Sequence, residues 1–198
     1  MFRFNDNQHK LYFWAMAVEA TQVLQDIKKG QYAPVYFLHG EESFYIDQIS
    51  DYIEANAIDE SQKGFNQVIC YGKDVDVATI LQHAKRFPMM SDKQVVIVKE
   101  AQDVKDLTKD VGEKMMLQYL DNPTPSTILV FAHKNKKIDG RKPLAKALNK
   151  KAILVETKKL YDNQVPGWIQ DYVKSKSCTI DMKASSCLLY TSPSPRDA

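Results

Sequence analysis

Five short apolar runs, separated by longer amphipathic segments, recur between residues 33 and 159. They are APVYFLHG (33–40), NQVICYG (66–72), QVVIVKEA (94–101), TILVFAHK (127–134) and AILVETKK (152–159). The third run places β-branched residues at consecutive positions, which is typical of a strand buried on both faces of a parallel sheet. Apolar strands that alternate with helices favour a parallel sheet with right-handed crossovers. The sequence therefore predicts an α/β domain with a mainly parallel five-stranded sheet flanked by helices.

The segments between these runs have apolar residues at helical spacing. The predicted helices cover residues 19–29, 41–58, 76–87, 103–121 and 140–151. After residue 160 the pattern changes to two helical segments, 162–177 and 179–190, with Asp181 as a possible cap. Two helices cannot bury their apolar faces alone, so we interpret residues 161–190 as the start of an incomplete helical domain that follows a first domain over residues 19–160.

Both ends of the chain differ from this pattern. Residues 1–18 are left as an N-terminal extension without an assigned structure, since the apolar stretch LYFWAMAVEA (11–20) does not have the pattern of a signal peptide. The tail TSPSPRDA (191–198) is rich in serine and proline, which is typical of a segment without regular structure. We interpret this tail as a foreign or artefactual end.

Composition excludes several functional classes. The 198 residues carry a net charge of only +2, which does not favour a nucleic-acid or membrane partner for the chain as a whole. The three cysteines form no CxxC pair, so we expect a reducing compartment and no zinc site, and the four histidines are scattered singly. No apolar run is long enough to predict a membrane span, and we expect a cytoplasmic protein.

The turn after the first predicted strand is where a nucleotide-binding loop would lie. Such a loop needs the pattern GxxxxGK[ST], whereas this chain has HGEESFYID, with a single glycine, Gly40. Glu41 and Glu42 follow, and carboxylates there suit the positive end of a helix but repel phosphates. We interpret Gly40, Glu41 and Glu42 as a degenerate phosphate loop, and we expect no catalytic residues, no metal and no cofactor.

A second segment, RFPMMSDK (86–93), has two methionines directly before a polar turn. Pro88 ends the predicted helix and favours an extended residue before it. Met89 and Met90 then have two possible locations. They pack on the domain's own sheet, which the residues alone favour, or they project as an exposed apolar pair that marks a partner site. Phe87 is interpreted as a core or wedge residue that supports them.

The chain resembles the delta subunit of the bacterial clamp loader, a part of the DNA polymerase III holoenzyme. Four stretches carry the resemblance: KGQYAPVYFLHGEESFYIDQI (29–49), AKRFPMMSDKQVVIVKEA (84–101), PSTILVFAHKNKKIDGRKPLAKAL (125–148) and VPGWIQDYVKSK (165–176). It extends from about residue 20 to 190. It implies an AAA+-like (P-loop-type) first domain without ATPase motifs, then a helical domain, then a collar domain that is absent from this sequence.

The resemblance also implies a function without catalysis. In this family a hydrophobic pair inserts into the peptide-binding pocket of the ring-shaped sliding clamp (the beta subunit). That pair falls on Met89 and Met90, beside Phe87 and Pro88, although the family often has leucine or aromatic residues there. The implied partners are the clamp and the ATPase and delta-prime subunits, with DNA met mainly through the assembled complex and no membrane.

Two other functions stay open at this point. A divergent P-loop NTPase would need lysine and serine or threonine after Gly40, and these are missing. A standalone nucleic-acid-binding module would use basic residues, which gather after the fourth predicted strand: Lys134, Lys136, Lys137, Arg141 and Lys142. These side chains form either a solvated charged face or a phosphate-binding surface, and no aromatic residues for base stacking interleave with them.

Overall fold

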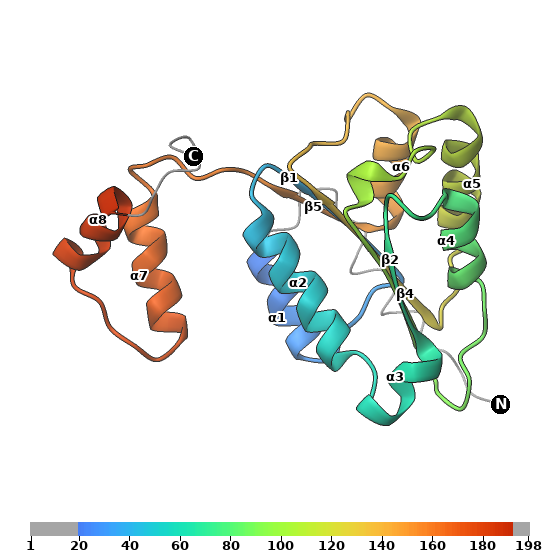
Figure 1. The fold of residues 1–198 in the computed structure, drawn as a ribbon, viewed down its shortest axis with the longest axis horizontal. Coiled ribbons are helices and arrows are strands. Elements are labelled where there is room, and N and C mark those ends of the chain that lie inside the picture. The colour runs from blue at the N-terminus through green and yellow to red at the C-terminus, as the bar shows by residue number, and fades with distance from the viewer. Residues whose placement is uncertain (1–19, 192–198) are drawn as a thin grey trace. The chain divides into compact units, whose positions relative to one another are not determined.

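The structure is a computed structural model that describes residues 20–191. Within this range the chain divides into two compact units, with the boundary between Lys158 and Lys159. The predictions for residues 1–18 and for the tail from residue 192 lie outside the described residues. Figure 1 gives the order of the helices and strands along the chain.

The first unit alternates strands and helices. Its strands are β1 (Val35–Gly40), β2 (Gln67–Tyr71), β3 (Gln94–Lys99), β4 (Thr127–Lys134) and β5 (Ile153–Thr157). Its helices are α1 (Ala20–Lys28), α2 (Ser43–Asn56), α3 (Glu60–Asn66), α4 (Val77–Ala84), α5 (Asp110–Asp121) and α6 (Pro143–Lys151), with a 3-10 turn, η2 (Ala101–Asp103), after β3. All five predicted strands are present, within two residues of their predicted bounds.

The five strands form one parallel sheet in the order β2-β3-β4-β1-β5. The central strands β3, β4 and β1 are buried almost throughout, as their continuous apolar runs predict. Helices α1 and α2 cover one face of the sheet, and α4, α5 and α6 cover the other (Figure 1). The prediction of a parallel five-stranded sheet flanked by helices is confirmed.

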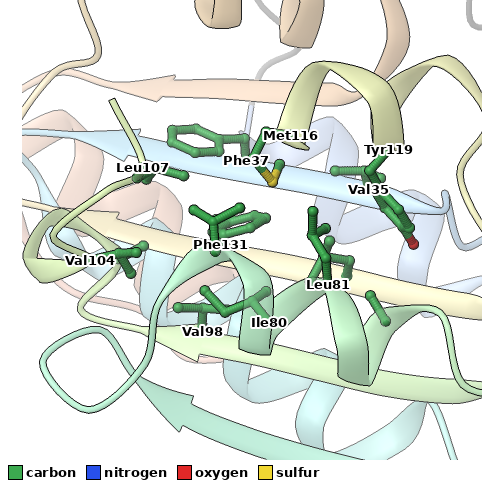
Figure 2. Packing of buried hydrophobic residues seen from close by; sticks show 14 of the residues in the cluster. Val35, Phe37, Ile80, Leu81, Val98, Val104, Leu107, Met116, Tyr119 and Phe131 are labelled. Atoms are coloured by element: carbon green, nitrogen blue, oxygen red, sulfur yellow. The ribbon is translucent and has the colours of Figure 1, made fainter. Parts of the chain in front are cut away.

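Two apolar clusters hold these three layers together. The larger one packs Phe37 and Phe131 of the sheet against Ile80 and Leu81 of α4 and Met116 of α5 (Figure 2). The rings of Phe37 and Phe131 lie 5.6 Å apart between their centroids. The second cluster, on the opposite face, joins α1 and α2 to the sheet and includes Ile46, Ile49 and Ile53, the residues whose spacing predicts α2. Alternate strand residues thus contribute to both cores.

The predicted helices differ from the observed ones in two places. Within the range 103–121, where a helical segment is predicted, the end of η2 and turns come first and helix α5 starts at Asp110. The sequence does not predict the short helix α3, because its seven residues, ESQKGFN, show no apolar periodicity and include a glycine. The predicted cap Asp76 is confirmed, since the amide of Thr79 donates a hydrogen bond of 2.8 Å to its carboxylate.

The second unit contains α7 (Val165–Ser175) and α8 (Met182–Thr191). The rings of Trp168 and Tyr172 on α7 stack with 5.3 Å between their centroids. The predicted cap Asp181 accepts a hydrogen bond of 2.6 Å from the amide of Ala184. Within residues 20–191, every helix is too short or too polar to cross a membrane.

Candidate functional site

The segment of residues 85–93, here called the tip, connects α4 to β3 and contains the two methionines. It precedes β3, so it lies at the N-terminal edge of the sheet. The chain enters β2 at the same edge from α3, because the two strands are parallel and paired. This arrangement brings α3 next to the tip, although the bonded residues Asn66 and Met89 are 23 positions apart in the sequence.

Two buried polar side chains end α4 and fix the start of the tip. Thr127 donates a hydrogen bond of 2.8 Å from its hydroxyl to the carbonyl of Ala84. The amide nitrogen of Gln94 donates to the carbonyl of Arg86 and to the hydroxyl of Thr127, 2.7 Å away. Carbonyls at the end of a helix lack partners within the helix, so these bonds satisfy groups that would otherwise be buried and unpaired.

The middle of the tip is held by α3. Asn66, the last residue of α3, donates a hydrogen bond of 2.8 Å from its amide nitrogen to the carbonyl of Met89. The backbone amide of Met89 donates in return to the side-chain oxygen of Asn66, at 2.6 Å. Gln62, one turn earlier on α3, donates at 3.3 Å to the carbonyl of Met90. The backbone of the tip is therefore tied to the domain at Met89 and Met90.

The methionine side chains point outward. Met90 is 97% exposed and Met89 is 53% exposed, although both are large apolar residues. The interpretation that both methionines pack on the domain's own sheet is therefore wrong. Met90 also has a φ of 52°, in the left-handed region that a long side chain seldom adopts. The tip offers an apolar pair to solvent at a defined place on the molecule.

Phe87 does not support the tip from within, contrary to the prediction of a core or wedge residue, because its side chain is 84% exposed. The predicted helix over 76–87 ends at Phe87. Instead α4 ends at Ala84, so Phe87 leaves the helical register. The following residue, Pro88, disfavours helical backbone at Phe87, so the helix does not resume there.

A groove of about 530 Å³ lies beside Met90. Its walls come from the end of α2, the loop between α2 and α3, α3 and the tip: Asn56, Ala57, Ile58, Asp59, Gln62, Met90, Ser91, Asp92 and Lys93. The ammonium of Lys93 also lies 5.2 Å from the ring centroid of Tyr32. The sequence does not indicate Asn66, Gln62 or this groove, because they depend on contacts between α3 and the tip over 23 and 28 positions.

The degenerate phosphate loop lies at the C-terminal edge of the sheet, opposite the tip. The backbone amides of Gly40 and Glu41 are already engaged by the protein. The amide of Gly40 donates to the carbonyl of Lys136 at 3.1 Å, and the amide of Glu41 donates to the carbonyl of Thr157 at 3.0 Å. Glu42 caps α2 by accepting a hydrogen bond of 3.0 Å from the amide of Phe44. A loop in this state does not present the free amides that phosphates require.

Charged side chains lie over the same loop. The ammonium of Lys137 lies 3.2 Å from a carboxylate oxygen of Glu156 and 3.7 Å from one of Glu41. The hydrogen bond to Glu156, followed by the charge of Glu41, raises the pKa of Lys137. The predicted helix-terminal charge of Glu41 thus also participates in an ion-pair network at this edge.

Two of the histidines that seem scattered in the sequence are neighbours in the sheet. His39 of β1 pairs with His133 of β4, and both are buried. The imidazole of His39 accepts from the amide of Ile138 at 3.4 Å, and Nδ1 of His133 lies 3.1 Å from the carbonyl of Lys136. Burial lowers the pKa of both, that of His39 to about 4. Among the described residues, no cluster of three or more His, Cys, Asp or Glu could hold a metal ion.

Most of the five basic residues singled out by the sequence have partners within the protein. Lys134 pairs with Asp47, and Lys137 pairs with Glu41 and Glu156. Arg141 makes two hydrogen bonds, of 3.0 and 3.1 Å, to the carboxylate of Asp139. Lys142 donates at 3.4 Å to the carbonyl of Thr108, and Lys136 is exposed. Their pairing with carboxylates weakens a phosphate-binding interpretation of this surface.

Comparisons with known proteins give one consistent answer. The family model described as DNA polymerase III, delta subunit matches residues 36–158. The DNA polymerase III subunit delta of Bacillus subtilis is 28% identical over 171 residues, which cover 84% of this chain and 49% of that protein. The solved structure of the Bacillus subtilis DNA clamp loader delta protein (YqeN) is also similar, with a TM-score of 0.73 and 27% identity over 86% of this chain and 51% of that one.

The chain thus spans about half the length of the relatives it matches. The matched residues include all five strands of the sheet except the first residue of β1, and they also include the tip. A family match over more than half of the chain agrees with the solved structure that shares its fold. This chain belongs to the family of DNA polymerase III delta subunits.

Proposed function

We propose that this chain is the clamp-binding part of a clamp loader delta subunit, which binds the sliding clamp through its tip and opens it for loading onto primed DNA. In this proposal Met89 and Met90 are the anchors, and Phe87 and Pro88 flank them. Residues 19–160 form the clamp-binding domain, and residues 161–190 begin a helical domain. The partners are the clamp, the ATPase and delta-prime subunits and, through the assembled complex, DNA, all in the cytoplasm.

The observation that carries this proposal is the exposure of two methionines on a backbone that the domain holds in place. Large apolar side chains that lie exposed next to one another on a domain surface often mark the binding site of a partner. Unbranched thioether side chains adapt to an irregular apolar pocket. Fully burying an exposed methionine side chain contributes roughly 1.5–3 kcal/mol, so the pair would supply a sizeable part of the affinity for a partner.

Clamp opening in this proposal requires no reaction by this chain. A partner that binds the open ring more tightly than the closed ring shifts the equilibrium between them. The engaged amides of Gly40 and Glu41 support a subunit that does not hydrolyse ATP itself. The same contacts count against a divergent P-loop NTPase, and the ion pairs of Lys134, Lys137 and Arg141 count against a standalone nucleic-acid-binding module.

The test is the double variant Met89→Ala, Met90→Ala, measured by titration against the purified sliding clamp of Bacillus subtilis. We expect the affinity to fall by at least about a hundredfold, because most of the apolar burial is lost. The melting temperature should stay close to that of the parent chain, since neither side chain is buried.

Val111→Ala is the matched control for this experiment. Val111 is another large apolar residue that is 71% exposed, but it lies in the first turn of α5. This helix follows β3, whereas the tip precedes β3. This variant should bind the clamp like the parent chain. If the double methionine variant binds with unchanged affinity, the tip is not the anchor and the proposal is wrong.

A further inference from the structure

The contact between Asn66 and Met89 is built from one side chain and one backbone unit. The amide of Asn66 donates to the carbonyl of Met89 and accepts from its N–H, at 2.8 and 2.6 Å. Two such bonds to the same residue close a ring, in the manner of one rung between antiparallel strands. Asn66 is 2% exposed, so its own position is fixed by the packing at the junction of α3 and β2.

Further hydrogen bonds hold the backbone on both sides of the contact between Asn66 and Met89. Gln62 holds the carbonyl of Met90, and Met90 has left-handed backbone. On the other side, Gln94 and Thr127 hold the carbonyls of Arg86 and Ala84. The backbone is thus tied before Phe87 and again at Met89 and Met90. The side chains of Phe87, Met89 and Met90 are exposed on this hydrogen-bonded segment.

We infer that Asn66 is a positioning residue for the binding surface of the tip, because its buried amide sets the direction in which Met89 and Met90 leave the domain. The inference rests on the proposed function, since it assigns the residue that organises the same site. A loop held in its bound form loses less conformational freedom when it docks, which raises affinity without adding a contact to the partner. Asn66 itself is covered by the protein and would not touch the clamp.

The experiment uses Asn66→Ala in the 198-residue chain, titrated against the purified sliding clamp of Bacillus subtilis. We expect the affinity to fall about tenfold, since the methionines are still present but no longer oriented. The amide of Met89 loses its acceptor, so its hydrogen exchange should become faster while the amides of β3 keep their protection. Gln67→Ala is the matched control, because that adjacent amide bonds the carbonyl of Glu54 on α2 instead of the tip.

A double-mutant cycle separates positioning from a general structural role. In the Met89→Ala, Met90→Ala background, Asn66→Ala should cause no further loss of the residual affinity. Asn66→Asp is a second variant in case the alanine variant does not fold. It keeps the acceptor for the Met89 amide but places an oxygen against the Met89 carbonyl, so it should also bind more weakly than the Gln67→Ala control.

The outcomes distinguish this inference from the function it rests on. If the methionine double variant loses binding and both Asn66 variants keep parental affinity, the role of Asn66 is wrong and the proposed function stands. If Asn66→Ala weakens binding equally in both backgrounds, its effect is general and the inference is also wrong. If the methionine double variant binds normally, the proposed function fails, and the inference fails with it.

Discussion

Gly40 is the residue whose surroundings leave the least freedom for change. Its φ is 142°, and a Cβ at this position would overlap both the carbonyl oxygen and the hydroxyl of Thr157. The hydroxyl of Thr157 also donates to the carbonyl of Glu42 at 2.6 Å, which closes the loop against β5. Glycine is thus required at position 40 because the end of β1 lies against the end of β5 at Thr157.

Gly40→Ala should therefore destabilise the domain by about 2–4 kcal/mol, because the backbone is strained and the end of β5 must move. Chemical denaturation followed by circular dichroism measures this change. Gly64→Ala is the control, since Gly64 lies in α3 and a methyl group there would have no neighbour within 4 Å. This variant should be neutral or stabilising by roughly 0.5–1 kcal/mol. Equal stability of the two variants would contradict the proposed role of Gly40.

Single residues also explain where the sequence misleads. Phe87 looks like a core residue only if α4 continues to Pro88, and the side chains that stop it, Gln94 and Thr127, come from two other strands. Asn66 has no motif at all, since its partner Met89 lies 23 positions away. The exposure of Met89 and Met90 contradicts the location that the residues alone favour, because it depends on those same long-range hydrogen bonds.

At the scale of single elements, β3 is a buried strand between β2 and β4, so it should tolerate no charged side chain in its middle. Val96 is fully buried and lies between Val68 of β2 and Leu129 of β4. Val96→Asp should abolish cooperative unfolding, because an unpaired charge in this position costs several kcal/mol, a large part of the stability of a small domain. Thermal unfolding followed by circular dichroism measures this loss.

Val111→Asp tests whether burial, and not the substitution itself, is responsible. Val111 is an exposed residue in the first turn of α5, where a carboxylate suits the positive end of the helix. Its melting temperature should stay within a few degrees of that of the parent chain. A cooperative transition in the Val96→Asp chain at the parent temperature would mean that β3 does not lie in the core.

Elements with a strong local signal were predictable, and elements without one were not. The strands follow from continuous apolar runs, and the parallel sheet follows from their alternation with helices. The helix α3 has seven residues, includes Gly64 and buries only Asn66, so no apolar periodicity marks it. The same helix holds the tip, which is why the sequence indicates the methionine pair but not the elements that support it.

At the scale of the whole molecule, the buried histidines link folding to pH. Burial lowers the pKa of His39 to about 4 and also lowers that of His133. Between the ordinary pKa of 6.5 and the lowered value, the unfolded chain binds protons that the folded chain does not. The free energy of unfolding should therefore be highest above pH 6.5 and should fall as the pH decreases toward 4, by at most about 1.4 kcal/mol per pH unit for each histidine.

Urea denaturation at a series of pH values measures this dependence, and NMR titration of the His39 ring measures its pKa directly. His39→Gln supplies a neutral acceptor for the amide of Ile138 without a titrating group, so its stability should depend less steeply on pH in this range. A His39 midpoint near 6.5 would contradict the expectation.

The tip and the degenerate phosphate loop lie at opposite edges of the sheet, so the two segments offer separate surfaces to partners. The strand β3 has six residues, so the two edges are separated by about 20 Å. Contacts made at the tip therefore use other residues than contacts made at the Gly40–Glu42 edge. A substitution at one edge can thus change the surface offered there while the residues at the opposite edge stay as they are.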